Sequence, residues 1–327
     1  MNSFSNKNQK LAIIGCGYWG MIIAKTLINL KFKKVYIFDN NLKNSKTLKN
    51  KFKSLILLKK YRNILDDKEI RNIFIVVPPT KSFPLIYNAL LNKKNVFVEK
   101  PGVVKINELI KLENLSKKNK LKLMFGYIYC YNNYIEKIHN ILNKNLLGKI
   151  LYVSFQRQNL GPIRNEVDVD YDLSSHDLSI ILKLFRKIPK IISFKKYDIL
   201  KKGIADISNL HLKEKNTFFD ISNSWLNPNK VRKITIIGSK KMLLFDEMNQ
   251  DDQLKIYNQY AKYPKIQDFK KKFFESKALI YSGKNSPVKV KSNPALNNEI
   301  FHFLNSKKNI TDAIFAKKIL IALKKLN

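Results

Sequence analysis

The sequence predicts an α/β protein that begins with a doubly wound parallel sheet and continues into a second α/β domain. Short apolar runs alternate with helical stretches over the first 126 residues, which is typical of such a sheet. A G-x-G-x-x-G sequence separates the first apolar run from the first helical stretch. The chain has 327 residues, which is enough for two domains of ordinary size.

The first motif joins a predicted strand over 11–14 to a predicted helix over 21–30. Its glycines have separate tasks: Gly15 permits a tight turn, Gly17 lets the backbone approach a pyrophosphate, and Gly20 allows close packing of helix and strand. Free N–H groups at the start of the helix would bind the pyrophosphate. We therefore expect a dinucleotide to bind at Gly15, Gly17, Tyr18, Trp19 and Gly20.

Asp39 ends the second predicted strand, over 35–38, and lies 19 residues after Gly20. This is the position at which a carboxylate binds the ribose hydroxyls of the cofactor's adenosine half. A carboxylate accepts a hydrogen bond from a free 2′-hydroxyl and repels a 2′-phosphate, so the sequence favours NAD over NADP. The neighbouring lysines Lys43 and Lys46 would weaken this preference.

The same alternation predicts helices over 41–52, 82–93 and 105–118, and strands over 70–77, 95–98 and 121–125. Two turns follow these strands at the carboxyl edge of the sheet, where ligands of such sheets bind. We therefore place Val77, Pro78, Pro79, Glu99 and Lys100 beside the cofactor.

The charge is unusual, because 62 basic residues against 25 acidic ones give a net charge of +37. Nucleic-acid readers rely on arginine for bidentate phosphate and guanine contacts, yet only six of the basic residues are arginine. Lysine is spread along the chain together with Asn, Ile, Phe and Tyr, which are residues of A/T-rich codons. We interpret the excess as genome composition and expect no specific nucleic-acid partner.

Two cysteines, Cys16 and Cys130, exclude a disulfide scaffold. The four histidines are widely spaced, so we expect no metal site. The longest apolar run, over 11–24, is too short to cross a bilayer, so we expect a cytoplasmic protein with no membrane partner.

These motifs, taken in order, resemble the Gfo/Idh/MocA family, which includes glucose–fructose oxidoreductase, inositol dehydrogenase and related nicotinamide-dependent sugar enzymes. The resemblance covers nearly the whole chain. It rests above all on Glu99-Lys100-Pro101 and on the Asp-x-x-x-His pattern at Asp172 and His176. Supporting stretches lie at 126–132, 147–150, 224–232 and 237–240.

The resemblance implies a Rossmann domain over 1–126 and a substrate-binding and oligomerisation domain over 127–327. The second domain would hold a large, mostly antiparallel open sheet, to which the strand-like runs at 150–158 and 191–246 belong. Family members commonly pair through this sheet, so the resemblance implies a homodimer or homotetramer. The segment 248–293 has weak periodicity and gives no clear element.

Oxidation of an alcohol by loss of hydride also requires a base for the hydroxyl proton and a positive charge for the developing alkoxide. The resemblance assigns the positive charge to Lys100, beside the nicotinamide and the substrate hydroxyl. His176 is the expected acid/base, because histidine exchanges protons near neutral pH. Asp172 is four residues earlier and would orient the imidazole if both lie on one helix.

We also expect substrate contacts from Tyr127, which stands where many relatives have histidine, and from Arg157 and Arg164. Two arginines would suit an acidic or phosphorylated substrate, although surface salt bridges are an equally good explanation for them.

The sequence thus predicts an NAD(H)-dependent dehydrogenase or reductase of CH–OH groups. It would transfer hydride between the nicotinamide and a secondary alcohol or ketone of a sugar, sugar acid or nucleotide-sugar. Two alternatives remain: a catalytically silent NAD-binding or sensor protein on the same fold, and a basic protein associated with nucleic acid.

Overall fold

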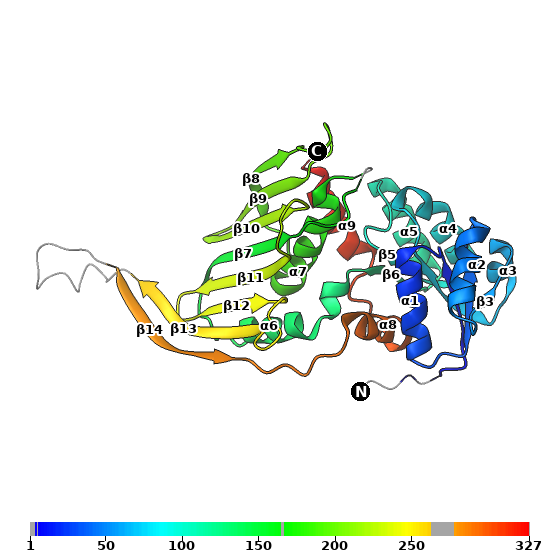
Figure 1. The fold of residues 1–327 in the computed structure, drawn as a ribbon, viewed down its shortest axis with the longest axis horizontal. Coiled ribbons are helices and arrows are strands. Elements are labelled where there is room, and N and C mark those ends of the chain that lie inside the picture. Colours follow the sequence, from blue (N-terminus) through cyan, green and yellow to red (C-terminus); the bar gives the residue numbers. More distant parts are fainter. Residues whose placement is uncertain (1–3, 5, 165–166, 263–277, 327) are drawn as a thin grey trace, which may run out of the picture. The chain divides into compact units, whose positions relative to one another are not determined.

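The computed structural model describes residues 4, 6–164, 167–262 and 278–326. The chain forms two compact units (Figure 1). The first unit comprises Met1–Asn132 and Asn293–Lys325, and the second comprises Asn133–Ser292 and Leu326–Asn327. Each unit has its own sheet and its own hydrophobic core, and each is described separately below.

The first unit is built on a six-stranded sheet with strand order β3-β2-β1-β4-β5-β6. Every neighbouring pair is parallel, which matches the doubly wound fold predicted from the sequence. The strands are apolar along nearly their whole length because both faces of the sheet are covered. They are β1 (Lys10–Ile14), β2 (Lys34–Phe38), β3 (Ile56–Leu57), β4 (Ile70–Ile75), β5 (Asn95–Glu99) and β6 (Leu123–Gly126).

The crossover connections of this sheet are helical. α1 follows β1 directly, and the remaining helices follow the strands in turn, as Figure 1 shows by the change from blue to cyan. The short strand β3 and the six-residue helix α3 are the elements in this region that periodicity did not predict. The helices are α1 (Tyr18–Asn29), α2 (Leu42–Lys51), α3 (Tyr61–Asp66), α4 (Pro79–Leu91) and α5 (Ile106–Lys118), followed by the 3₁₀ turn η1 (Ile128–Tyr131).

The chain returns to the first unit at its C-terminal end, through α8 (Ala295–Asn305) and α9 (Ala313–Lys324). The Phe303 ring of α8 packs against Phe74 and Phe97, with ring centroids 5.2 and 5.9 Å apart. The connection to α9 pairs with the outer strand of the sheet, where the Phe125 N–H donates to the carbonyl of Thr311. Residues 293–325 therefore complete the core of the first unit, whereas a single boundary at residue 126 would assign them to the second.

The second unit contains an eight-stranded sheet with strand order β14-β13-β12-β11-β7-β10-β9-β8. Only the β7–β10 pair is parallel, and the other pairs are antiparallel. The sheet thus confirms the mostly antiparallel fold class. It also includes two strands from the segment 248–293, β13 and β14, while residues 263–277 lie outside the described part. The strands are β7 (Ile150–Gln158), β8 (Lys190–Tyr197), β9 (Ile207–Glu214), β10 (Thr217–Ser224), β11 (Val231–Gly238), β12 (Met242–Asp246), β13 (Leu254–Lys262) and β14 (Leu279–Pro287).

The two faces of this sheet differ. Along β7, Val153, Phe155 and Arg157 are buried, while the side chains between them are at least partly exposed. The helices α6 (Asn133–Asn143) and α7 (Ser175–Phe185) belong to the same unit and pack on each other. A π-helical turn, η2 (Asp170–Ser174), leads directly into α7.

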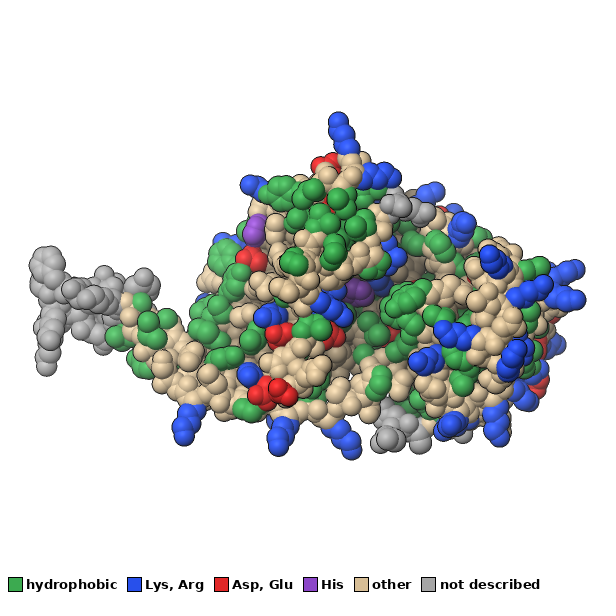
Figure 2. Space-filling model, viewed as in Figure 1, with side chains coloured by type: hydrophobic (Ala, Val, Ile, Leu, Met, Phe, Trp, Pro, Cys, Tyr) green, Lys and Arg blue, Asp and Glu red, His purple; other side chains and the backbone are tan. Residues whose placement is uncertain are grey.

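The basic side chains are scattered over the visible surface and are not gathered into one stripe (Figure 2). This distribution agrees with the interpretation that the charge reflects composition. Within the described ranges, no helix is long and apolar enough to cross a membrane. Nor do the described His, Cys, Asp and Glu side chains form a group of three or more that could hold a metal ion.

Candidate active site

The glycine loop after β1 is fixed by close backbone contacts. The Gly15 N–H donates to the carbonyl of Phe38 at 2.9 Å, and Gly15 has a φ of +99°, which favours glycine. A Cβ at Gly15 would collide with the carbonyl oxygen of Val76, and one at Gly20 would collide with the carbonyl oxygen of Gly15. The helix and the two strands can approach this closely only because both positions lack a side chain.

Gly17 differs from the other two glycines, because a Cβ there would meet no atom within 4 Å. Among the described residues, the space around that Cβ position is open, and α1 begins at the next residue, Tyr18. No side chain caps the start of α1, and its first turn carries no acidic residue. The first N–H groups of the helix are therefore available to an anion, as a bound pyrophosphate requires.

Asp39 connects the end of β2 to this loop. Its Oδ2 accepts a hydrogen bond from the Cys16 N–H at 2.8 Å, and its Oδ1 accepts one from the Asn41 N–H at 2.8 Å. Each carboxylate oxygen can accept a second bond, so the side chain can still bind ribose hydroxyls. A small cavity of about 200 Å³ adjoins it, lined by Cys16, Gly17, Tyr18, Met21, Thr47, Leu48 and Lys51.

Cys16 lies inside the loop as a buried thiol. Burial raises its pKa to about 12, and the negative charge of Asp39 acts in the same direction. The start of α1 therefore does not produce a reactive thiolate here. Cys16 thus fills the loop as a small residue between two glycines.

Tyr18 and Trp19 form the first turn of α1 and lie on the surface. Their side chains are 72% and 37% exposed, and their rings contact each other edge-on with centroids 6.2 Å apart. They border the glycine loop, as expected for residues near a cofactor. Neither is packed into the core.

The Val77-Pro78-Pro79 turn closes the other side of the loop. The Val76 N–H donates to the carbonyl of Ile14 at 2.8 Å, and a Cγ of Val77 lies 3.0 Å from the position a Gly15 Cβ would occupy. Pro79 is the first residue of α4, a position that suits proline because its missing N–H would have no partner there. The helix therefore starts three residues before the predicted position.

Glu99 and Lys100 lie where β5 ends, at the carboxyl edge of the same sheet. Glu99 is half-buried, and burial raises its pKa to about 7, against the opposing effect of the positive charge and backbone N–H of Lys100. Its carboxyl lies against the neighbouring strand, because a Cβ at Gly126 would be 3.1 Å from the Glu99 Cδ. Glu99 is therefore a weaker acid than an exposed glutamate, and it lies next to the lysine expected to act on substrate.

Tyr127 is a correction to the expected substrate-binding set. Its side chain is fully buried, and its ring packs against Phe315 of α9 with centroids 5.5 Å apart. Its hydroxyl has no hydrogen-bond partner among the described residues, and burial raises its pKa far above the usual value. Tyr127 is part of the core of the first unit, where its ring packs against α9.

Asp172 and His176 lie in the second unit, on either side of the junction between η2 and α7. The expected arrangement was a single regular helix with the two side chains on one face. The structure instead places Asp172 in the π-helical turn, and π-turns are rare features that often mark functional sites. Asp172 forms an ion pair with the predicted substrate residue Arg164, whose Nε lies 3.5 Å from Oδ2. Arg164 is 47% exposed.

Arg157 is a second correction. Only 5% of it is exposed, and its Nε and Nη2 donate to Asp177 Oδ1 at 3.0 and 2.8 Å. Burial raises the pKa of Asp177, while the positive charges of Arg157 and Arg232 lower it. Arg157 therefore joins β7 to α7 as a buried ion pair. It is neither a surface salt bridge nor a group presented to substrate.

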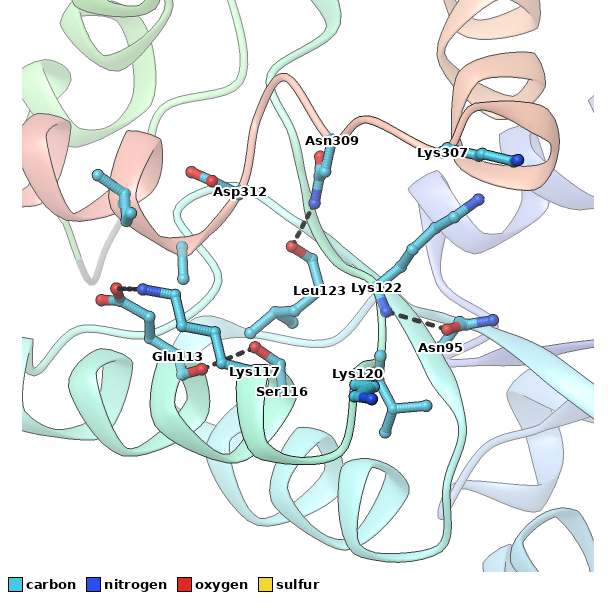
Figure 3. A pocket seen from close by; sticks show the side chains of 13 residues that line it. Asn95, Glu113, Ser116, Lys117, Lys120, Lys122, Leu123, Lys307, Asn309 and Asp312 are labelled. Carbon is cyan, nitrogen blue, oxygen red and sulfur yellow. Dashed lines mark hydrogen bonds and ion pairs between the residues drawn. The ribbon is translucent and has the colours of Figure 1, made fainter.

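A larger cavity, of about 410 Å³, lies elsewhere in the first unit (Figure 3). It borders Asn95 and Leu123, the first residues of β5 and β6, and so lies at the amino edge of the sheet. Ligands of doubly wound sheets bind at the carboxyl edge. The two acids of the cavity already have partners: Glu113 pairs with Lys117 and Lys317, and Asp312 caps α9. This cavity is not the cofactor site.

The glycine loop gives a matched pair of variants. Gly17→Ala should leave the melting temperature close to that of the wild type, because its Cβ enters open space. It should weaken NADH binding by tenfold or more, since the pyrophosphate would need that space. Gly15→Ala should instead lower the melting temperature, because its Cβ meets the Val76 carbonyl. Thermal unfolding and NADH fluorescence titration of both variants would test this; unchanged NADH affinity in Gly17→Ala would contradict it.

Asp177→Ala should lower the free energy of unfolding by about 3–5 kcal/mol, because it leaves the buried Arg157 charge without its partner. Arg164→Ala removes one member of a largely exposed pair and should cost less than about 1 kcal/mol. Urea unfolding measures both values. An equally small effect of the two substitutions would mean that Arg157 is not structural.

Comparisons with known proteins agree with this geometry. Residues 9–127 match the model of an oxidoreductase family with an NAD-binding Rossmann fold, Gfo/Idh/MocA. A curated relative, an uncharacterized oxidoreductase named YrbE from Bacillus subtilis (strain 168), is 24% identical over 174 residues. The match covers 51% of this chain and 51% of the relative, so the chain matches only about half of that protein's length.

Solved structures resemble the chain over nearly its whole length. UDP-N-acetylglucosamine 3-dehydrogenase GnnA from Acidithiobacillus ferrooxidans is 19% identical, with a TM-score of 0.77 over 97% of this chain and 95% of that one. GenD2 from gentamicin A biosynthesis, solved in complex with NAD, is 16% identical, with a TM-score of 0.77 over 99% and 94%. These likenesses show the shared fold. The glycine loop lies within residues 9–127, the part of the chain that matches the NAD-binding Rossmann domain of the Gfo/Idh/MocA oxidoreductases.

Proposed function

We propose that this protein binds NAD(H) and transfers hydride between the nicotinamide and a secondary alcohol or ketone of a sugar, sugar acid or nucleotide-sugar. The open side of Gly17, at the uncapped start of α1, is the observation that carries the proposal. Asp39 lies beside it, and Lys100 follows the end of β5 in the same parallel sheet. Cofactor and lysine would thus share the carboxyl edge of one rigid sheet.

The cofactor-binding residues of the proposal are those that border this edge. The N–H groups of α1 would bind the pyrophosphate, and the Asp39 carboxylate would accept hydrogen bonds from the adenosine ribose. Both Asp39 oxygens already accept one backbone N–H, which fixes the carboxylate in place. A 2′-phosphate would meet this fixed negative charge, and the proposal therefore favours NAD over NADP.

Lys100 and His176 have complementary roles in the proposal. Bound nicotinamide would supply the hydride acceptor or donor. The Lys100 ammonium would stabilise the developing alkoxide oxygen of the substrate, and His176 would take up or return the hydroxyl proton. Asp172, held by Arg164 at 3.5 Å, would orient His176. These roles are assigned from the sequence motifs. Lys100 belongs to the first unit, and Arg164, Asp172 and His176 belong to the second.

Arg164 supports the substrate class. It is half-exposed, and its guanidinium already recognises a carboxylate, that of Asp172. A guanidinium in such a position can also bind the carboxylate of a sugar acid or the phosphate of a nucleotide-sugar. One solved relative is a dehydrogenase of UDP-N-acetylglucosamine, and a nucleotide-sugar is accordingly the first substrate class to screen. Tyr127 and Arg157 have no part in the proposed contacts, because both are buried.

The proposal extends to assembly and location. The outward face of the second unit's sheet carries exposed apolar side chains on its strands, including Tyr197 on β8 and Phe218 on β10. Such a face suits pairing with a second copy of the chain, and we propose a homodimer or homotetramer. Both cysteines are buried and neither forms a disulfide within the described part of the chain, as suits a reducing, cytoplasmic compartment.

Cofactor preference can be measured directly. We expect NADH to bind at physiological salt at least tenfold more tightly than NADPH, because of the Asp39 charge. Asp39→Ser should reduce this ratio to near one by weakening NADH and relieving the repulsion of NADPH. Fluorescence titration of both proteins with both cofactors gives the four affinities. Tighter binding of NADPH by the wild type would overturn the preference, and absence of binding by either cofactor would favour a silent protein.

Lys100→Ala should lower kcat by about two orders of magnitude or more, because an alkoxide in the active site would lose its positive charge. NADH affinity should change by no more than a few-fold. Lys81→Ala removes an exposed lysine from α4 and serves as the matched control. Steady-state kinetics on a nucleotide-sugar and polyol panel, together with NADH titration, would test this. Full turnover by Lys100→Ala would remove Lys100 from the mechanism.

A further inference from the structure

Glu299 is a buried carboxyl that the proposed mechanism does not use. It lies on α8 and is 0% exposed, on the same buried side of the helix as Ile300 and Phe303. Neither of its carboxyl oxygens has a hydrogen-bond partner among the described residues. A buried carboxylate without a donor is costly, so its burial requires an explanation.

Contacts on both sides of Glu299 hold α8 in place. The Asn298 Nδ2 donates to the carbonyl of Tyr131 at 3.0 Å, and the His302 ring packs on the Tyr131 ring with centroids 5.2 Å apart. One residue further, the Phe303 carbonyl accepts a hydrogen bond from Lys122 Nζ at 2.7 Å. Glu299 therefore cannot turn towards water without disrupting the packing of α8 against η1 and β6.

Glu99 is the acid whose charge acts on Glu299. Burial raises the pKa of Glu299 well above its usual value, and the negative charge of Glu99 raises it further. Glu99 in turn lies against Gly126, its cross-strand partner where β5 pairs with β6. Two carboxyls from distant parts of the sequence thus interact in the core, directly before Lys100.

The chemistry of such a pair is restrictive. Two ionised carboxylates only accept hydrogen bonds and repel each other, whereas one shared proton supplies a donor and removes a charge. Other titratable groups nearby are Tyr131 and Cys130 on η1, His302 on α8, and Lys100 after β5. The Lys100 charge favours the ionised form of Glu99, which leaves Glu299 as the member that holds the proton.

We propose that Glu299 is a neutral carboxylic acid that donates its proton in a hydrogen bond to the Glu99 carboxylate, and so positions the turn that carries Lys100. Glu299 is then a positioning residue. It keeps a single negative charge beside the lysine, and it fixes the Glu99 side chain against β6. Its effect on turnover rests on the proposed function, whereas its protonation does not.

The protonation can be tested on the purified protein without any substrate. A group whose pKa is raised in the folded state stabilises the protein fully below its unfolded pKa, and this contribution is lost as pH rises towards the folded pKa. Glu299→Gln keeps the shape and a donor but cannot ionise. The unfolding equilibrium constant of the wild type, relative to that of Glu299→Gln, should therefore rise about tenfold per pH unit between about pH 5 and pH 7. A flat ratio would overturn the proposal.

Two further measurements identify the partner. The infrared carbonyl band of a protonated carboxylic acid should be present at neutral pH and absent from Glu299→Gln. In a Glu99→Gln background, Glu299 loses the facing charge, so the rise of the ratio with pH should end at a lower pH. A band that persists in Glu299→Gln, or a rise that Glu99→Gln leaves unchanged, would contradict the pair.

Turnover then tests the positioning role. Glu299→Gln can still donate to Glu99 and should keep kcat within about threefold, whereas Glu299→Leu, which cannot donate, should lower kcat by about tenfold or more at unchanged KM. Equal kcat values for Gln and Leu would reject the positioning role. If Lys100→Ala retained full activity while the infrared and stability results held, the proposed function would fail and the shared proton would stand.

Discussion

Close backbone packing at the end of β1 is the constraint on which the first unit depends. Gly15 lies against the Val76 carbonyl, and Gly20 lies against the Gly15 carbonyl, so β1, β4 and α1 converge at distances no side chain would allow. As a result, α1 begins next to the open space beside Gly17. It also sets the position of Asp39, whose carboxylate holds the loop through the Cys16 N–H. The proposed dinucleotide site would thus arise from packing that stabilises the fold even without a ligand.

Much of this unit could be predicted because its signals are local. A glycine motif between a strand and a helix, followed by an acid at the next strand end, requires only short stretches of sequence. The short strand β3 gave no signal, because two residues cannot show a period. The start of α4 at Pro79 was missed for a related reason: a proline pair marks a turn as well as a helix start.

The less predictable features depend on residues far apart in the sequence. Arg157 was expected to contact substrate, and its ion pair with Asp177 could not be predicted. Asp177 lies 20 residues later, on α7, and no local pattern joins the two. Tyr127, which was expected to contact substrate, instead packs against Phe315, which belongs to a helix almost 190 residues downstream. The spacing of Asp172 and His176 suggested one regular helix, and only the structure reveals the π-helical turn between them. The sequence around Glu299 predicted no role for it, because the proposed role depends on Glu99, which lies far away in the sequence.

The return of residues 293–325 to the first unit has a consequence for biosynthesis. Phe74 and Phe97 are made early, yet the Phe303 ring that covers them emerges from the ribosome more than 200 residues later. Until then the nascent sheet exposes an apolar surface and the outer edge of β6. Residues 133–292 of the second unit are synthesised during this interval. The N-terminal unit therefore cannot complete its core in the order of its sequence, because the residues that cover it are made last.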